Sequence, residues 1–285
     1  MSGHIRFWIG PVLLVAAIGT LQAQSCSQCA EWNIPQKPFK LYGNTFYVGP
    51  HGLSSVLITS PKGHVLIDGA LAQSAPQIEA NIRALGFRVE DIKLILNTHV
   101  HFDHAGGIAE LQRASGARVV ASPASAKVLE HGAVSVDDPQ YGEVRSIAKV
   151  RRVGILADGE KLQVGPIALT AHLTPGHTPG GTSWTWTSCE GDRCLKMVFA
   201  DSMSAISNGT YRYSAHPGVL AGFERDFRFL EAVPCDVLIT PHPDASGLWE
   251  RVGYPTGEDT GQCRELAARG RTGLKERLEQ EAKRK

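Results

Sequence analysis

The sequence has 285 residues, of which 42% are hydrophobic, so the chain is long enough to bury a substantial core. Its 29 Lys and Arg residues nearly balance its 28 Asp and Glu residues, which excludes the basic surplus typical of nucleic-acid-binding proteins. With 7% aromatic residues, 30 Gly and 16 Pro, the composition also excludes collagen-like and disordered chains and indicates a soluble globular protein.

The N-terminal segment differs from the rest of the chain, in which apolar runs are short. A basic residue precedes a mostly apolar stretch at 7–18, and the small residue Ala23 follows at a suitable cleavage position, so we interpret residues 1–23 as a secretory signal peptide. A membrane anchor is the alternative, but the stretch contains a Gly-Pro pair and is shorter than the roughly 20 residues of a spanning helix. We therefore expect export to the periplasm and a mature chain, 24–285, that has no membrane span.

Disulfides are expected in an exported chain with an even number of cysteines. The six cysteines all lie in the predicted mature chain: Cys26, Cys29, Cys189, Cys194, Cys235 and Cys263. Cys189 and Cys194 flank a turn between two strand-like runs, which favours a local pair, and Cys235 and Cys263 could then join a strand to the C-terminal helix. The Cys-x-x-Cys motif that begins at Cys26 resembles a redox or zinc half-motif, but no strand-to-helix context surrounds it, so we favour a structural pair.

Short strand-like runs alternate with helical patterns, and no low-complexity linker divides them, so we expect one domain of class α/β (α+β). The predicted strands are 45–48, 55–59, 64–68, 93–96, 118–121, 150–156, 167–172, 182–187, 197–200 and 237–240. The predicted helices are 75–85, 105–114, 220–232 and 258–283. Strands on both sides of helices imply a layered architecture.

The most informative segment is the His-x-His-x-Asp-His run at 99–104, between a predicted strand end and a helix start. In an extended chain, residues two apart point the same way, so His99 and His101 can bind one metal ion together. Asp103 and His104 follow where the chain turns into the helix, and they are placed to serve a second ion. Imidazole and carboxylate are good zinc ligands, and a tetrahedral catalytic site takes about three of them and leaves one position for water.

Two such sites need two further ligands, and loops that follow strands are the places to look for them. His177 lies in a loop rich in Gly and Pro, where the backbone can approach a ligand closely, and His242 directly follows an apolar strand. The remaining histidines of the mature chain lack this context and are interpreted as packing or surface residues: His51, His64, His131, His172 and His216.

On these residues the sequence resembles the metallo-β-lactamase superfamily. The order of features matches as well: Asp68 after an apolar strand, the histidine run, His177 in its loop, Asp201 after a strand, and His242 near a late strand. The resemblance covers most of the mature chain. It implies a four-layer αβ/βα sandwich with the metals at one edge, between two similar halves.

Within that superfamily, the sequence most resembles the third subclass (B3) of zinc β-lactamases. That subclass uses three histidines at one zinc ion and an aspartate with two histidines at the other, which here implies the sets His99, His101, His177 and Asp103, His104, His242. The resemblance therefore implies two zinc ions per chain. Ser202 and Ser204 stand where serines replace the cysteine ligand of the first subclass. The resemblance extends to the pairs Cys189 with Cys194 and Cys235 with Cys263, whereas the Cys-x-x-Cys pair does not match the family pattern.

The resemblance implies zinc-dependent hydrolysis of the β-lactam amide bond by a metal-bound hydroxide, because two zinc ions lower the pKa of a shared water towards about 7. Asp103 would orient the hydroxide as well as bind metal. Ser202 and Ser204 would bind the substrate carboxylate directly or through water, although local turn hydrogen bonds also account for them. Asp68 would fix the loop that carries the ligands, and Asp201 would support the site.

Three other interpretations are compatible with parts of the sequence. An exported thioesterase or lactonase of the same superfamily would use Asp201 to bridge both metals, and a zinc-carrying module would bind metal without turnover. A serine β-lactamase is disfavoured, because Ser146-x-x-Lys149 leads into a strand-like run and the nearest match to a Lys-Thr-Gly motif, at 271–273, lies in a helix. Tyr141 either lines the cleft or faces solvent. The expected partner is a small-molecule β-lactam rather than nucleic acid, and we expect a monomer.

Overall fold

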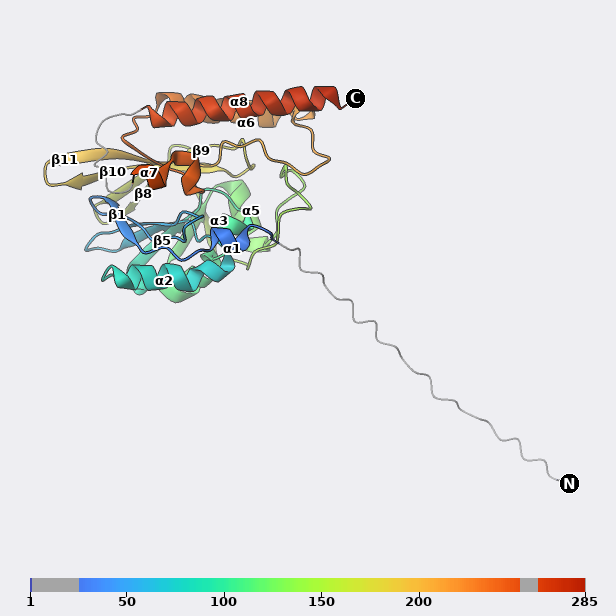
Figure 1. Cartoon of the computed structure of the whole chain (residues 1–285). Helices are drawn as coiled ribbons and strands as arrows, with labels where there is room; N and C mark the ends of the chain where they lie inside the picture. Colours follow the sequence, from blue (N-terminus) through green and yellow to red (C-terminus); the bar gives the residue numbers. More distant parts are fainter. Residues whose placement is uncertain (2–25, 252–260, 285) are drawn as a thin grey trace.

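The computed structural model of the chain describes Met1 and residues 26–251 and 261–284. The rest of the predicted signal peptide and the first three residues of the predicted terminal helix lie outside the described residues. The described chain forms two β-sheets that pack face to face, each covered by helices on its outer face (Figure 1). The predicted four-layer αβ/βα sandwich is confirmed.

The first sheet contains seven strands in the order β1 to β7. Its strands are β1 (Phe39–Tyr42), β2 (Thr45–Tyr47), β3 (Val56–Ile58), β4 (His64–Ile67), β5 (Ile92–Leu96), β6 (Arg118–Ala121) and β7 (Val153–Ile155). Neighbours from β1 to β4 are antiparallel, whereas β4, β5, β6 and β7 pair in parallel. The carboxyl ends of β4 and β5 therefore meet at one edge of the sheet.

The second sheet contains five strands in the order β12-β11-β10-β9-β8. Its strands are β8 (Lys161–Val164), β9 (Ile167–Leu173), β10 (Thr182–Glu190), β11 (Arg193–Phe199) and β12 (Val237–Ile239). β11 and β12 are parallel, and the other pairs are antiparallel. Because β9 and β11 both run opposite to β10, the strands β9, β11 and β12 all end at the same edge.

Helices form the two outer layers. They are α1 (Cys29–Trp32), α2 (Ala75–Ala84), α3 (Phe102–Ala105), α4 (Ile108–Ser115), α5 (Pro123–His131), α6 (Pro217–Ala232), α7 (Leu248–Arg251) and α8 (Gln262–Lys283). α2, α4 and α5 pack on the seven-stranded sheet, and α6 and α8 pack on the five-stranded sheet (Figure 1). Within the described ranges, no helix combines the length and apolar character needed to span a membrane.

Alternation of side chains along the strands divides the core into three layers. In β4, Val65 and Ile67 pack between the two sheets, whereas Leu66 packs under the helices of the first outer layer. In β11, Phe199 packs between the sheets and Val198 packs under α6 and α8. Strands buried on both faces explain why these segments read as continuous apolar runs in the sequence.

Each of the ten predicted strands corresponds to a strand in the structure, and the four predicted helices correspond to α2, α4, α6 and α8. The helix predicted from Ala105 begins only at Ile108, because a separate turn, α3, precedes it. Gly106 lies between them, where an added Cβ would approach Ala72 N to 2.7 Å. Two strands and four helices of the described chain were not predicted: β1, β8, α1, α3, α5 and α7.

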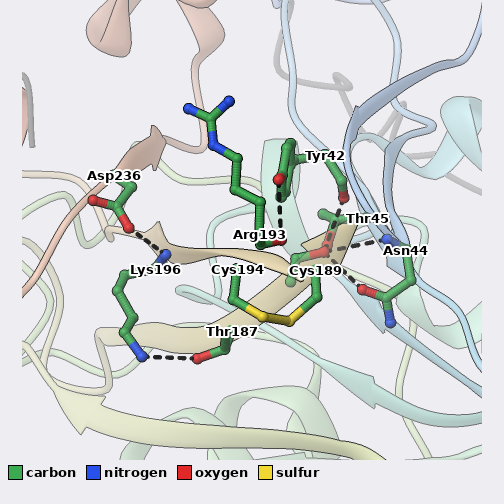
Figure 2. Close-up of a disulfide and its surroundings, with 10 residues drawn as sticks. Tyr42, Asn44, Thr45, Thr187, Cys189, Arg193, Cys194, Lys196 and Asp236 are labelled. Carbon is green, nitrogen blue, oxygen red and sulfur yellow. Dashed lines mark hydrogen bonds between the residues drawn. A yellow bond between two sulfur atoms is a disulfide. The ribbon is translucent and has the colours of Figure 1, made fainter. Parts of the chain in front are cut away.

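Three disulfides lie in the described chain: Cys26–Cys29, Cys189–Cys194 and Cys235–Cys263. Cys189 and Cys194 are opposite each other at the tip of the β10–β11 hairpin, shown in Figure 2. The neighbouring Ser188 hydroxyl donates to the carbonyl of Tyr42 at 2.9 Å, and the Tyr42 hydroxyl donates to the carbonyl of Arg193 at 3.1 Å. The hairpin tip is thus attached to the first sheet as well as closed by a disulfide.

The Cys235–Cys263 disulfide should contribute more to stability than the Cys189–Cys194 disulfide, because it closes a loop of 28 residues rather than 5. From loop-closure entropy, replacing both Cys235 and Cys263 with Ser should lower the free energy of unfolding by about 3 to 4 kcal/mol, against about 2 kcal/mol for the hairpin pair. Urea unfolding of the two double variants measures this difference. An equal decrease in the free energy of unfolding for the two double variants would contradict the loop-closure explanation.

Candidate metal centre

The predicted metal ligands are delivered by strand ends from both sheets. His99 lies three residues after the end of β5, and His177 lies in the loop that follows β9. His242 lies three residues after the end of β12. All these strands end at the same edge of the sandwich. Their side chains can therefore meet although they come from distant parts of the sequence.

The one-turn helix α3 explains the spacing of the histidine run. His101 precedes the helix with extended backbone, φ −67° and ψ 151°, so His99 and His101 remain in an extended segment. Asp103 and His104 lie within the helical turn. The change from extended to helical backbone in the middle of the run divides its four side chains into two pairs.

The structure brings the six side chains together in two groups, each with ligand atoms within 4.8 Å of one another. The first group is His99, His101 and His177, and the second is Asp103, His104 and His242. The groups are adjacent, because the rings of His99 and His104 have centroids 4.4 Å apart. All of these residues are buried except His242, which is partly exposed.

The spacing inside the second group fits a metal ion. Oδ2 of Asp103 lies 3.2 Å from Nε2 of His104 and 3.3 Å from Nε2 of His242. Ligands about 2.0 Å from a tetrahedral zinc ion lie about 3.3 Å from one another. The donor set and its spacing therefore match a zinc site.

In the first group, each imidazole uses one nitrogen for a hydrogen bond to an oxygen acceptor outside the group. His99 Nδ1 donates to Asp201 Oδ1 at 2.7 Å, and His177 Nδ1 donates to the carbonyl of Ser204 at 2.8 Å. His101 uses the other ring nitrogen: its Nε2 lies 3.1 Å from Asp138 Oδ2. Carboxylates and carbonyls only accept, so the remaining nitrogen of each ring has the lone pair that a metal needs.

Burial and neighbouring side chains shift the pKa values of several residues in the two ligand groups. Burial lowers the pKa of His99 well below its usual value and lowers the pKa of His177 to about 3, so both rings are neutral at neutral pH. Burial disfavours the charged form of Asp103, but the neighbouring His104 and His242 hold the pKa of its carboxyl well below the usual range. Burial also lowers the pKa of His104. The neutral rings of His99 and His177 and the ionised carboxylate of Asp103 are the forms in which these groups bind metal.

Asp68 supports the loop that carries His99. Its Oδ1 accepts from the backbone N–H of Thr98 and its Oδ2 accepts from the Thr98 hydroxyl, both at 2.7 Å. Asp68 is fully buried and adopts a φ of 62°, a left-handed conformation that is uncommon for a residue with a side chain. Asp68 belongs to neither ligand group, so its contacts hold the loop rather than the predicted ligands themselves.

Asp201 lies behind the first group rather than between the two groups. Its Oδ1 accepts from the far nitrogen of His99, and it is not a member of either ligand group. Burial raises the pKa of Asp201 to about 6. Among the described residues, its Oδ2 has no hydrogen-bond partner. This position does not suit a carboxylate that bridges two metals.

Ser202 and Ser204 lie at the edge of the first group. Their hydroxyls are 2.8 Å apart, and the Ser204 hydroxyl lies 3.3 Å from His177 Nδ1. Both residues are partly exposed. Local hydrogen bonds of the two serines are therefore present, and both residues line a pocket together with His242.

The other histidines and Tyr141 take no part in either group. Four rings pack on other aromatic side chains, His51 on Trp249, His64 on Phe87, His172 on Phe229 and His216 on Tyr211, and His131 is exposed at the end of α5. Tyr141 is 47% exposed and faces solvent.

Two residues at the site were not identified from the sequence. Asp138 is buried in a segment, 132–150, without helix or strand, and reaches His101. Trp32 of α1 places its ring 5.2 Å from the ring of His242. No local sequence pattern marks either residue, because both are far from the histidine run in the sequence and only the fold brings them to the site.

The fold and the paired ligand groups define a metal-binding protein of the four-layer sandwich class. The chain belongs to the metallo-β-lactamase superfamily, because the sequence model of that family matches residues 48–195.

Solved structures similar to this chain are metallo-β-lactamases. The Rm3 metallo-β-lactamase is 55% identical with a TM-score of 0.88, and the alignment covers 90% of this chain and 99% of that one. MEM-A1, a subclass B3 metallo-β-lactamase isolated from a soil metagenome library, is 49% identical with a TM-score of 0.87, over 89% of this chain and 100% of that one. The resemblance to subclass B3 is confirmed.

Curated relatives are more distant. The hydroxyacylglutathione hydrolase of Anaeromyxobacter dehalogenans (strain 2CP-C) is 32% identical over 127 residues, which cover 45% of this chain and 39% of that protein. The first three curated relatives are matched over 39%, 34% and 46% of their lengths, so the chain spans less than half of each.

Asp138 should influence metal affinity through His101. Asp138→Ala removes the acceptor that orients the ring, and zinc affinity, measured by competition with a chromophoric chelator, should fall about 10- to 100-fold. Asp138→Asn keeps an acceptor oxygen, so its zinc affinity should fall less than that of Asp138→Ala. Asp137→Ala, at the exposed neighbouring position, is the matched control and should leave the affinity unchanged. An unchanged affinity in Asp138→Ala would show that His101 is oriented by other contacts.

Proposed function

We propose that this chain is a zinc-dependent β-lactamase that hydrolyses the amide bond of β-lactam antibiotics and so confers resistance to them. The observation that carries the proposal is the convergence of six ligand side chains in two adjacent groups. Alignment over nearly the whole of a metallo-β-lactamase at 55% identity supports it.

One zinc ion would be held by His99, His101 and His177, and a second by Asp103, His104 and His242. Two ions bound there would polarise the substrate carbonyl and lower the pKa of a bound water, so that hydroxide is available near neutral pH. The neutral imidazoles and the ionised carboxylate described above are ready to bind metal without losing a proton.

Asp103 has a second role in this proposal. Its Oδ2 faces both histidines of its group, which leaves Oδ1 to accept a hydrogen bond from the attacking water. A carboxylate in that position orients the water for attack on the amide carbon. We propose Asp103 as the catalytic residue of the chain.

Ser202 and Ser204 are proposed to bind the carboxylate of the substrate. Their paired hydroxyls are partly exposed and lie next to His177, so they can donate to an anion positioned beside the metal centre. Because each hydroxyl has one hydrogen, both serines donate to the anion only when the hydrogen bond between them is broken.

Export of a single-domain monomer to the periplasm is part of the proposal. The three disulfides are typical of an oxidising compartment, and the similar structures are metallo-β-lactamases. The Cys26–Cys29 pair is proposed to be structural, because it lies beside the short helix α1.

A thioesterase or lactonase of the same superfamily is the alternative, and the curated hydroxyacylglutathione hydrolases are a reason to test it. That alternative needs Asp201 between the two metals. Its position behind His99 favours the β-lactamase instead.

Hydrolysis of a carbapenem by the purified chain tests the proposal directly. Dialysis against a chelator should abolish hydrolysis, zinc should restore it, and metal analysis should give about two zinc ions per chain. A hydroxyacylglutathione thioester should be hydrolysed far more slowly. Full β-lactamase activity without metal would refute the zinc mechanism, and turnover of the thioester alone would establish the alternative.

Replacement of Asp103 separates its role from general effects on folding. Asp103→Asn should weaken the second zinc site and lower kcat at least about 100-fold at saturating zinc, which corresponds to about 2.7 kcal/mol of transition-state stabilisation. His131→Ala should have little effect, because His131 lies at the exposed end of α5. A near-normal kcat in Asp103→Asn would place the orienting role elsewhere.

A further inference from the structure

A surface hollow of about 490 Å³ lies between the end of α4 and the beginnings of β6 and β7. Because β4 to β7 are parallel and the metal ligands follow the carboxyl end of β5, the hollow is at the opposite edge of the first sheet. Half of the described residues that line it are arginines and none is acidic: Gln112, Gly116, Ala117, Arg118, Arg151 and Arg152. The hollow therefore concentrates positive charge in a chain whose basic and acidic residues nearly balance.

The three arginines of the hollow differ from the arginine nearest to them on α4. Arg113 forms an ion pair with Glu110 one turn away. Within residues 26–251 and 261–284, no hydrogen bond or ion pair involves the guanidinium of Arg118, Arg151 or Arg152, and all three residues are exposed. A guanidinium has five N–H donors and no acceptor. These groups are therefore available to an anion from solution.

The fold keeps the three positive charges together. β6 and β7 pair in a parallel register that makes Arg118 and Arg152 neighbours across the two strands. The side chain of Gln112 fixes the backbone of Arg151, because it accepts from the Arg151 N–H at 3.0 Å and donates to the Arg151 carbonyl at 2.8 Å. Like charges at neighbouring positions repel each other. An anion bound among the three guanidinium groups would offset this repulsion.

The backbone of Arg152 gives a second, independent indication of a site. Its φ is 55°, a left-handed conformation that costs free energy for a residue with a side chain and is typical of functional sites. The other non-glycine residues of the described chain with this backbone, Asp68 and Ala70, both adjoin the metal centre: Asp68 holds Thr98, and Ala70 pairs with Ala105 of α3. Glycine would adopt the same φ at no steric cost. What an arginine supplies at position 152 is its charge.

We infer that this hollow binds the phosphate group of a phosphate monoester. Guanidinium groups match phosphate oxygens with pairs of parallel hydrogen bonds. A monoester has three terminal oxygens and a charge of about −1.5 to −2 at pH 7, which suits three arginines without an acidic neighbour in the hollow. The same group occurs in soluble phosphate esters and in the headgroups of phosphorylated lipids, so either source offers the chemistry that the hollow recognises.

Calorimetric titration of the whole chain with glycerol 3-phosphate tests the inference. The ester should bind and glycerol should not. Arg118→Gln and Arg151→Gln should each weaken binding roughly tenfold, because each removes a charge-assisted contact. Added salt should also weaken binding, since the arginines are exposed.

Vesicles of phosphatidylcholine that contain phosphatidic acid, whose headgroup is the same monoester, distinguish the two sources. Sedimentation of the unmodified chain with these vesicles, lost in Arg118→Gln, would identify a lipid headgroup as the ligand. Binding of glycerol 3-phosphate without sedimentation would identify a soluble ester.

Arg152→Gly separates the charge of this residue from its backbone. The variant should weaken binding about as much as Arg118→Gln, whereas its Tm should stay the same or rise, because glycine relieves the left-handed conformation. A loss of binding that comes only with a lower Tm would indicate a structural role for Arg152 and contradict the inference.

Arg113→Gln is the matched control, because Arg113 is an exposed arginine of α4 that is paired with Glu110 and does not line the hollow. Its affinity for glycerol 3-phosphate should equal that of the unmodified chain. Zinc content should be unchanged in every variant, since the hollow and the metal centre lie at opposite edges of the sheet. Failure of both probes to bind, binding that survives replacement of the three arginines, as it would at the metal centre, or an equal loss in Arg113→Gln would overturn the inference.

Discussion

The hydrogen bonds behind the first group of ligands are the constraint on which the centre depends. A neutral imidazole has one nitrogen that donates and one that accepts, and only the accepting nitrogen can bind metal. Asp201, Asp138 and the carbonyl of Ser204 each receive the donating nitrogen of one ring. These three acceptors therefore set both the tautomer and the orientation of the three rings. The rings are held in this arrangement in the absence of metal.

The loop after β5 is fixed by polar groups from both sheets. Asp68, after β4, holds Thr98 through two hydrogen bonds. From the other sheet, the backbone N–H of Thr182 donates to the carbonyl of Thr98 at 2.8 Å, and the indole of Trp184 donates to the carbonyl of Asn97 at 3.0 Å. The unusual backbone of Asp68, which costs of order 1 kcal/mol, is maintained by these surrounding contacts. The same contacts satisfy backbone groups that the fold would otherwise bury unpaired.

Features that depend on neighbouring residues in the sequence could be predicted, whereas contacts that depend on the tertiary fold could not. The histidine run specifies its own geometry within six residues, and the apolar strands specify the layers through their burial on both faces. Asp138 could not be identified in this way, because only the path of an irregular segment brings it to His101. The helix α5 is a different case, since its signals were present: Ser122 caps its first turn and Gly132 ends it with a φ of 86°.

The contact between Trp32 and His242 joins the first helix of the described chain to a ligand that follows the last strand. A chain that is synthesised from its N-terminus acquires His242 late, so the second ligand group is completed only after nearly all of the chain is available. Contacts between positions so distant in the sequence carry a large loop-closure entropy, which slows their formation. A metal ion that binds the completed group adds its binding free energy to the stability of the folded chain, because the three side chains of that group converge only there.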